Sequence, residues 1–179
     1  MDGYVQLDEI SMDILKEIGN VGTGNAVTSL SRMMEQPIEL DLPSLKVVKY
    51  YKMHELLEQP EELQTGILIE VTGQLKGIFL FMLSEAFTKT VINTILGEEE
   101  RNLTSMDDME CSLISELGNI MCGSYIRALS QLMDMDMDVS VPELCIDMGG
   151  AILTYPMSRW VIVSDDILLI ENIFHMSGD

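Results

Sequence analysis

The chain has few cysteines and no long apolar run. Its three cysteines form no Cys-x-x-Cys pair and have no histidine nearby, which excludes a zinc ligand set and argues against a disulfide framework. The N-terminus has neither the basic nor the apolar segment of a signal peptide. No apolar run approaches the roughly 18–20 residues that a membrane-spanning helix needs. We therefore expect a soluble, cytoplasmic protein without membrane insertion.

Positive charge is also scarce, because 10 lysine and arginine residues stand against 30 aspartate and glutamate residues, a formal net charge of −20. Such a polyanion repels phosphate backbones and anionic lipid surfaces, so we expect no nucleic acid among its partners. In contrast, apolar residues are plentiful at 47% of 179 residues, which is enough for a sizeable core.

An internal repeat dominates the sequence. The order Glu-x-Gly-Asn-x-x-x-Gly begins at Glu17 and again at Glu116, an offset of 116 − 17 = 99 residues. Around each copy, apolar residues recur at i, i+4, i+8 and i+11, which predicts an amphipathic helix with one buried face. These residues are Ile10, Ile14, Ile18 and Val21 in the first copy, and Met109, Leu113, Leu117 and Ile120 in the second.

The hydrophobic period changes to two after each helix, at 37–43 and 133–142, which predicts half-buried strands that end at Pro43 and Pro142. Residues 65–83 are typical of a hairpin. Residues 84–97 predict a helix that Ser84 starts and Gly97 stops.

Together these patterns predict an α+β fold: a single domain with pseudo-two-fold symmetry, in which amphipathic helices pack on a mainly antiparallel sheet. The second repeat is expected to be shorter than the first by about two elements at its C-terminal end. The expected limits are 1–179 for the domain, 7–97 for repeat 1, 98–108 for a charged linker and 106–179 for repeat 2.

Each predicted helix also carries a narrow polar stripe. At about 100° per residue, its three polar residues fall within about 60° of one another. They are Asp13, Glu17 and Asn20 in the first copy, and Ser112, Glu116 and Asn119 in the second. A solvated helix face would explain a lone Glu–Asn pair, but asparagine and glycine are poor helix formers and both recur here, whereas neighbouring polar positions differ between the copies.

The chemistry available to these stripes is limited. No Ser–His or Cys–His set accompanies them, and one glutamate per helix is too sparse for a metal cage. An asparagine amide can orient an attacking water, as glutamine does in GTP hydrolysis, and a glutamate can pair with a lysine of another molecule. We therefore expect a site that a partner completes, with glycines that let the partner come close.

The two stripes resemble the signature of the CheC / CheX / FliY phosphatases of bacterial and archaeal chemotaxis. The pattern D/S-x3-E-x2-N-x22-P occurs twice, as in CheC, from Asp13 to Pro43 and from Ser112 to Pro142. The resemblance implies a substrate, the phosphorylated response regulator CheY, which supplies both the aspartyl phosphate and Mg²⁺. It implies no cofactor or metal of the chain's own, and it suggests the deamidase CheD as a further partner.

The resemblance also implies residue roles. Asn20 and Asn119 would orient the attacking water, and Glu17 and Glu116 would pair with the regulator's active-site lysine. Asp13 and Ser112 would orient the helix, while Pro43 and Pro142 would be structural. Two alternatives stay open: a non-catalytic CheC-like scaffold that binds or regulates CheD, and an acidic adaptor of flagellar switch or signalling assemblies.

Overall fold

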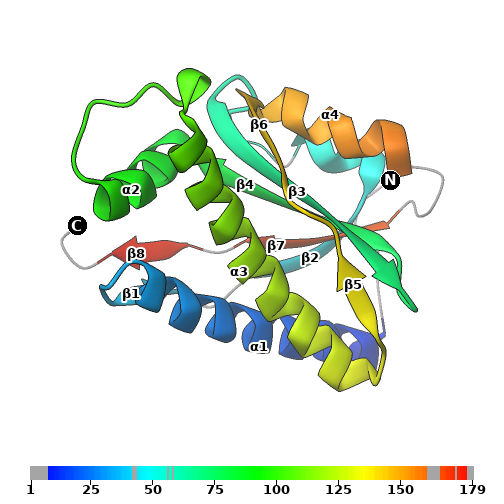
Figure 1. The fold of residues 1–179 in the computed structure, drawn as a ribbon. Coiled ribbons are helices and arrows are strands. Elements are labelled where there is room, and N and C mark those ends of the chain that lie inside the picture. The colour runs from blue at the N-terminus through cyan, green and yellow to red at the C-terminus, as the bar shows by residue number, and fades with distance from the viewer. Residues whose placement is uncertain are drawn as a thin grey trace.

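The computed structural model describes residues 8–41, 44–55, 57, 59–160, 166–171 and 173–176. Helices and strands alternate along the chain (Figure 1). In chain order they are α1 (Glu9–Met33), β1 (Ile38–Leu40), β2 (Ser44–Lys49), the 3-10 helix η1 (Tyr50–Glu55), β3 (Leu63–Gly73), β4 (Gly77–Ser84), α2 (Glu85–Leu96), the 3-10 turn η2 (Leu103–Ser105), α3 (Asp108–Met133), β5 (Met137–Val139), β6 (Glu143–Met148), α4 (Gly149–Trp160), β7 (Asp166–Glu171) and β8 (Phe174–Met176).

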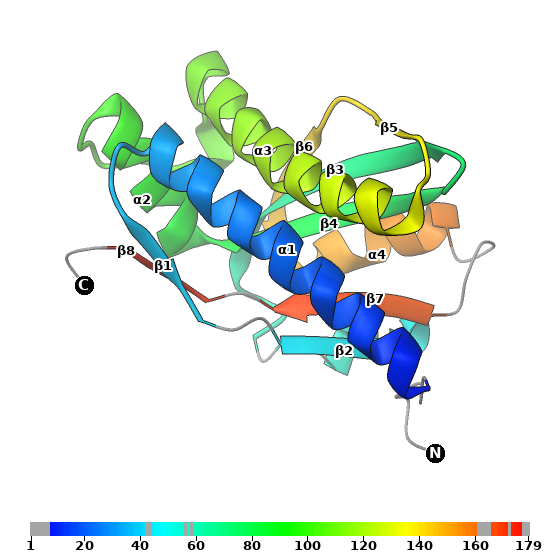
Figure 2. The ribbon, with the colours of Figure 1, turned by 90° about the horizontal axis from the view of Figure 1, so that it is seen from below.

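Helices pack on antiparallel strands, so the α+β prediction is confirmed. The long helices α1 and α3 lie side by side and run in opposite directions over the strands (Figures 1 and 2). Strand β3 has a helix on each face. A Cβ added to Gly118 of α3 would lie 2.5 Å from Ile67 Cγ2, and one added to Gly66 would lie 2.8 Å from Ile152 Cγ2 of α4. Burial on both faces explains why β3 is buried continuously from 65 to 69.

The strands are exchanged between the two halves of the chain. Strands β1 and β2 of the first half pair with β8 and β7 of the second, while β5 and β6 of the second half pair with β3 of the first. All of these pairs are antiparallel. Between its pairing with β6 and its pairing with β5, strand β3 advances three residues while the β5–β6 segment advances four. In the same way, the β7–β8 segment advances three residues between its two pairings while the β1–β2 segment advances four. The recurring register is what pseudo-two-fold symmetry predicts.

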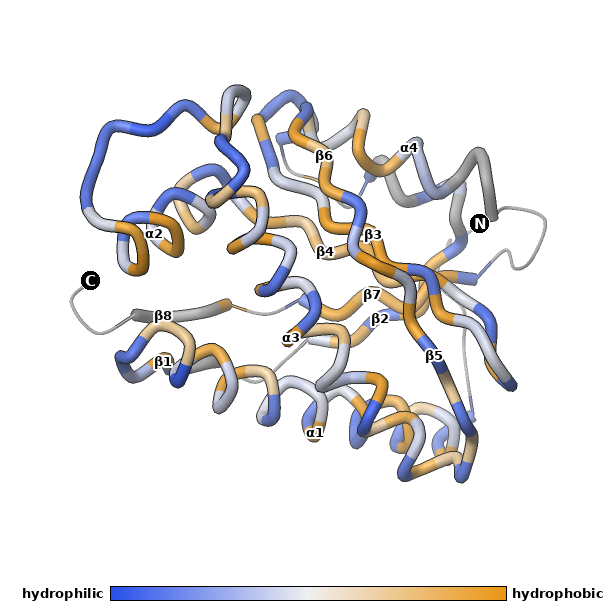
Figure 3. The backbone as a smooth tube through the Cα atoms, viewed as in Figure 1, coloured by the Kyte–Doolittle hydropathy of each residue, from blue (hydrophilic) through white to orange (hydrophobic). Residues whose placement is uncertain are grey.

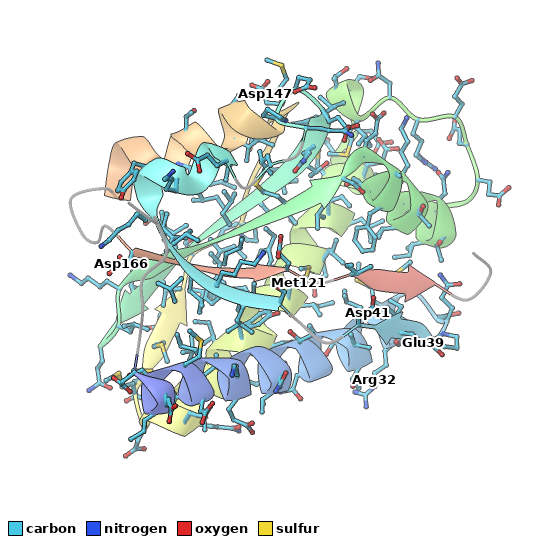
Figure 4. All side chains as sticks on the ribbon, turned by 180° about the vertical axis from the view of Figure 1, so that it is seen from behind. Arg32, Glu39, Asp41, Met121, Asp147 and Asp166 are labelled. Atoms are coloured by element: carbon cyan, nitrogen blue, oxygen red, sulfur yellow. The ribbon has the colours of Figure 1, made fainter. Side chains whose placement is uncertain are left out.

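Ion pairs brace the β2–β7 pair. Lys49 Nζ lies 2.6 Å from Asp166 Oδ1, and Lys46 Nζ lies 3.0 Å from Glu171 Oε2. Figure 4 shows Asp166 at one end of this pair. Because these side chains are well exposed, each ion pair contributes at most about 1 kcal/mol, and the pairing depends mainly on backbone hydrogen bonds and apolar contacts.

The predicted hairpin and the helix that follows it are confirmed. Strands β3 and β4 pair from Gln64 with Ser84 to Val71 with Gly77. Ser84 caps α2 by accepting a hydrogen bond from the backbone N–H of Phe87, and Gly97 ends the helix with φ at 99°, a conformation that favours glycine.

The prediction of a strand at 133–142 was wrong for the first part of that range. Helix α3 continues to Met133, and Asp134 ends it in the left-handed region with φ at 51°. Only Met137–Val139 forms strand β5. The methionine–aspartate alternation suits a strand, but Met133 still belongs to the long amphipathic helix, and the left-handed Asp134 turns the chain before β5 begins.

The connection between α2 and α3 is hydrophilic, as the colouring of Figure 3 shows. Residues 98–100 are exposed within it, and η2 buries Leu103 before Asp107 caps α3. No helix within the described ranges is long and apolar enough to cross a bilayer.

Candidate functional site

Both long helices begin at an aspartate. Asp8 accepts a hydrogen bond from the backbone N–H of Ser11 at 2.8 Å, and the hydrogen bonds from Ser11 hold the pKa of Asp8 below its ordinary value. Asp107 accepts from the backbone N–H of Glu110, whose carboxylate in turn accepts from the N–H of Asp107, a complete capping box. The caps fix where each helix starts, and with it which residues face outward.

All four Glu and Asn side chains of the repeated motif are exposed: Glu17, Asn20, Glu116 and Asn119. Within the part of the chain that the structure describes, none of them forms a side-chain hydrogen bond or an ion pair. Each pair is therefore presented to solvent, with its amide and carboxylate available to another molecule. The helices α1 and α3, which carry one pair each, run in opposite directions (Figure 2).

The other motif residues differ between the copies. Asp13 lies 3.7 Å from Lys16 Nζ on the helix surface. Its counterpart Ser112 donates a hydrogen bond to the carbonyl oxygen of Asp108 at 2.7 Å, so its hydroxyl is engaged with its own helix. Pro142 is half-buried directly before β6, and Pro43 lies outside the described residues.

The first glycine of each motif faces inward, contrary to the expectation that the motif glycines let a partner approach. A Cβ on Gly19 would lie 2.8 Å from Leu45 Cδ1 of β2, just as one on Gly118 would meet Ile67 of β3. These glycines let the helices approach the strands closely. Only the later glycine of each motif, Gly24 and Gly123, has open space around an added Cβ, with nothing within 4 Å.

The helix crossing depends on a residue that the repeat comparison missed. Tyr125 of α3 packs its ring against Gly22 of α1, and its hydroxyl lies 2.6 Å from Thr23 Oγ1 in a buried hydrogen bond. The repeat partner of Tyr125 is Ala26, so identity between the copies could not reveal it. The signal available in the sequence was the glycine at position 22, which leaves room for a ring.

The second copy has Met121 and Cys122 where the first has Gly22 and Thr23, and all four are buried. Met121 lies near the centre of the molecule (Figure 4). Burial raises the pKa of the Cys122 thiol to about 12, so the thiol stays neutral. These substitutions therefore change core packing and leave the exposed Glu–Asn face of α3 as it is in α1.

Among the described residues, no group of His, Cys, Asp and Glu is arranged to hold a metal ion. The fold and the two stripes together define a class of protein: a pseudo-symmetric α+β domain that displays the same acid–amide pair on each of two packed helices.

Comparison with known proteins finds a matching family. The model of the CheC-like family matches residues 10–46 and 109–146, one match on each repeat. Both repeats of the chain therefore resemble the CheC-like family. It is 26% identical over 174 residues to the CheY-P phosphatase CheC of Bacillus subtilis, a match that covers 96% of this chain and 83% of that protein.

Two further proteins, one compared by sequence and one by structure, are also similar to this chain. The CheY-P phosphatase CheX of Thermotoga maritima is 30% identical over 108 residues, covering 57% of this chain and 66% of CheX. The crystal structure of Thermotoga maritima FliY superposes with a TM-score of 0.75 at 23% identity, covering 98% of this chain and 87% of that one. The structural likeness shows the shared fold.

Proposed function

We propose that this protein dephosphorylates a phosphorylated response regulator of the CheY type, using one Glu–Asn pair on each long helix. Two relatives carry the name CheY-P phosphatase, which supports this reaction class. The observation that carries the proposal is the duplicated pair of exposed side chains without partners of their own, set on helices that are otherwise closely packed. A solvated helix face would explain one such pair, but it does not explain why the same pair recurs at the same spacing on both helices.

The amide of Asn20 or Asn119 would orient the attacking water. A carboxamide has both an acceptor oxygen and donor hydrogens, so it can hold a water in line with the phosphorus atom. The water oxygen then forms the new P–O bond, the bond between phosphorus and the aspartyl oxygen breaks, and inorganic phosphate and the free aspartate carboxylate result. The regulator would bring its own Mg²⁺, and positioning of this kind can lower a barrier by several kcal/mol without a general base.

Glu17 and Glu116 would dock the helix by pairing with the regulator's active-site lysine. Each lies three residues before its asparagine, so the two side chains share one face of the helix. A charge-assisted hydrogen bond to a lysine would fix the asparagine over the phosphoryl group. In this proposal, Asp13 and Ser112 help to orient the helix next to the pair.

The proposal predicts that the Asn20→Ala / Asn119→Ala double variant loses about 100-fold or more of the dephosphorylation rate, because removing one orienting group commonly costs 10²–10³ in kcat. The measurement is loss of phosphate from phosphorylated CheY with Mg²⁺, for wild type, both single variants and the double variant. Alanine is a better helix former than asparagine, so a lost rate would not reflect a lost helix.

Asn25→Ala and Gln131→Ala are matched controls, because both remove an exposed amide from the same two helices outside the stripes. They should keep the wild-type rate. A double variant as fast as wild type contradicts the role of the asparagines. A wild-type protein that binds phosphorylated CheY without hydrolysis favours the scaffold alternative instead.

A further inference from the structure

One large apolar residue at the start of each long helix is not part of the core. Ile10 and Met109 occupy the same repeat position and were expected to begin the buried face, but 74% of Ile10 and 65% of Met109 is exposed. Ile14, one turn further along α1, is 49% exposed. The prediction of burial was wrong at these positions, because the buried residues of α1 start only at Ile18, and the start of α3 buries the face of Glu110 and Ile114 instead of Met109.

The exposed apolar residue, the glutamate and the open glycine follow one another at intervals of seven residues. The sets are Ile10, Glu17 and Gly24 on α1, and Met109, Glu116 and Gly123 on α3. Seven residues are two turns, about 10.5 Å along the axis, and the direction drifts by only about 20°. Each set is therefore a nearly straight line on its helix, which we name a docking stripe, and the asparagine lies beside its middle.

The two ends of a docking stripe differ in shape. At one end a large apolar side chain projects into solvent, and at the other a glycine leaves space with nothing within 4 Å of an added Cβ. A partner whose phosphoryl group meets the asparagine can also cover both ends when its surface extends about 15 Å along the helix toward the apolar residue. It gains an apolar contact at the first end and can approach the helix backbone at the second.

We propose that the docking stripes bind the phosphorylated regulator, with Ile10 and Met109 contacting an apolar patch about 15 Å from its phosphoryl group, since each lies ten residues before its asparagine. This inference rests on the proposed function, and it adds the residues that select the regulator among phosphoproteins. Acidic residues flank the apolar end of each helix, Glu9 and Asp13 on α1 and Asp108 on α3, so the matching patch has basic groups at its rim.

The test compares Ile10→Ser, Met109→Ser and their double variant with wild type in steady-state dephosphorylation of phosphorylated CheY. A residue that only docks the substrate affects ground state and transition state alike, so the double variant should raise KM about tenfold while kcat stays within about twofold. The Asn20→Ala / Asn119→Ala variant should show the opposite, a lower kcat. Val141→Ser is the matched control, because Val141 is 83% exposed in the β5–β6 connection and lies on neither helix.

An unchanged KM in the double serine variant overturns the inference even when the proposed function holds. If wild type shows no turnover, the proposed function fails, and titration of fluorescently labelled CheY with both proteins still decides the inference: equal affinities overturn it and weaker binding of the variant supports it. A change of oligomeric state in sedimentation of the variant alone would assign the stripes to contacts between copies of this chain, and so would also overturn it.

Discussion

Gly22 and Gly24 lie two residues apart on α1 and face opposite ways. A methyl group on Gly22 would meet the ring of Tyr125, whereas one on Gly24 would meet nothing. Gly22→Ala is therefore expected to destabilise the protein by about 1–3 kcal/mol through overpacking of the helix crossing. Gly24→Ala should stabilise it by up to about 1 kcal/mol, because alanine is the better helix former. The free energy of unfolding in urea measures both effects.

The repeated glycines offer the same comparison on α3. Gly118→Ala should behave like Gly22→Ala, because its methyl group would reach Ile67, and Gly123→Ala should behave like Gly24→Ala. Equal effects of the inward and outward substitutions would contradict the assignment of Gly22 and Gly118 to close packing.

At the scale of single elements, the start of α3 depends on a buried ion pair. Arg101 and Glu110 each keep about 10% side-chain exposure. The guanidinium also donates to Asn93 Oδ1 and to the carbonyl of Gly97, so it ties the end of α2 to the first turn of α3. The same glutamate completes the capping box of α3. One carboxylate thus joins the cap, the connection and the preceding helix.

Glu110→Ala is expected to lower the free energy of unfolding by about 3 kcal/mol, because it removes the buried counter-charge of Arg101 and leaves only the exposed carboxylate of Glu99, 3.8 Å away. This loss of stability is near the lower end of the range for buried ion pairs, because Arg101 still donates hydrogen bonds to Asn93 Oδ1 and to the carbonyl oxygen of Gly97. Glu85→Ala is the control: it removes the exposed partner of Lys89 on α2 and should cost no more than about 1 kcal/mol. Comparable losses in the two variants would show that Arg101 is well solvated without Glu110.

Periodicity predicted the elements whose pattern is local. The long helices, the β3–β4 hairpin and α2 follow from spacing and caps alone, and so does the outward direction of Glu17, Asn20, Glu116 and Asn119. In contrast, α4 has two glycines at its start and Pro156 inside it, which are signals against a helix, and packing on β3 and β6 overrides them.

The sequence could not predict which apolar residues a helix buries along its length. Ile10 and Ile18 share one apolar pattern, yet Ile18 is buried and Ile10 is exposed, because burial depends on which distant segments pack against each turn of the helix. That limit is set by contacts between distant segments. For the same reason, the repeat showed that two halves exist but not that they exchange strands.

At the scale of the whole molecule, strand exchange makes each half depend on the other. The first half contains β3, whose partners β5 and β6 come from the second half, and the second half contains β7 and β8, whose partners come from the first. The crossing of α1 and α3 joins the halves again through the hydrogen bond between Thr23 and Tyr125. A half alone would therefore have unpaired strand edges and an uncovered helix face.

Cutting the chain in the exposed connection at 98–100 should give two fragments that are largely unfolded separately and that fold when mixed. Each fragment alone cannot bury enough apolar surface to offset its conformational entropy. Circular dichroism of each fragment and of the equimolar mixture measures this, with the intact chain as reference. A fragment that unfolds cooperatively by itself would contradict mutual dependence. Because both docking stripes lie on helices that fold only when the halves pack together, dephosphorylation should return only in the mixture. Its rate should reach half of its maximum at the fragment concentration at which half of the fragments associate.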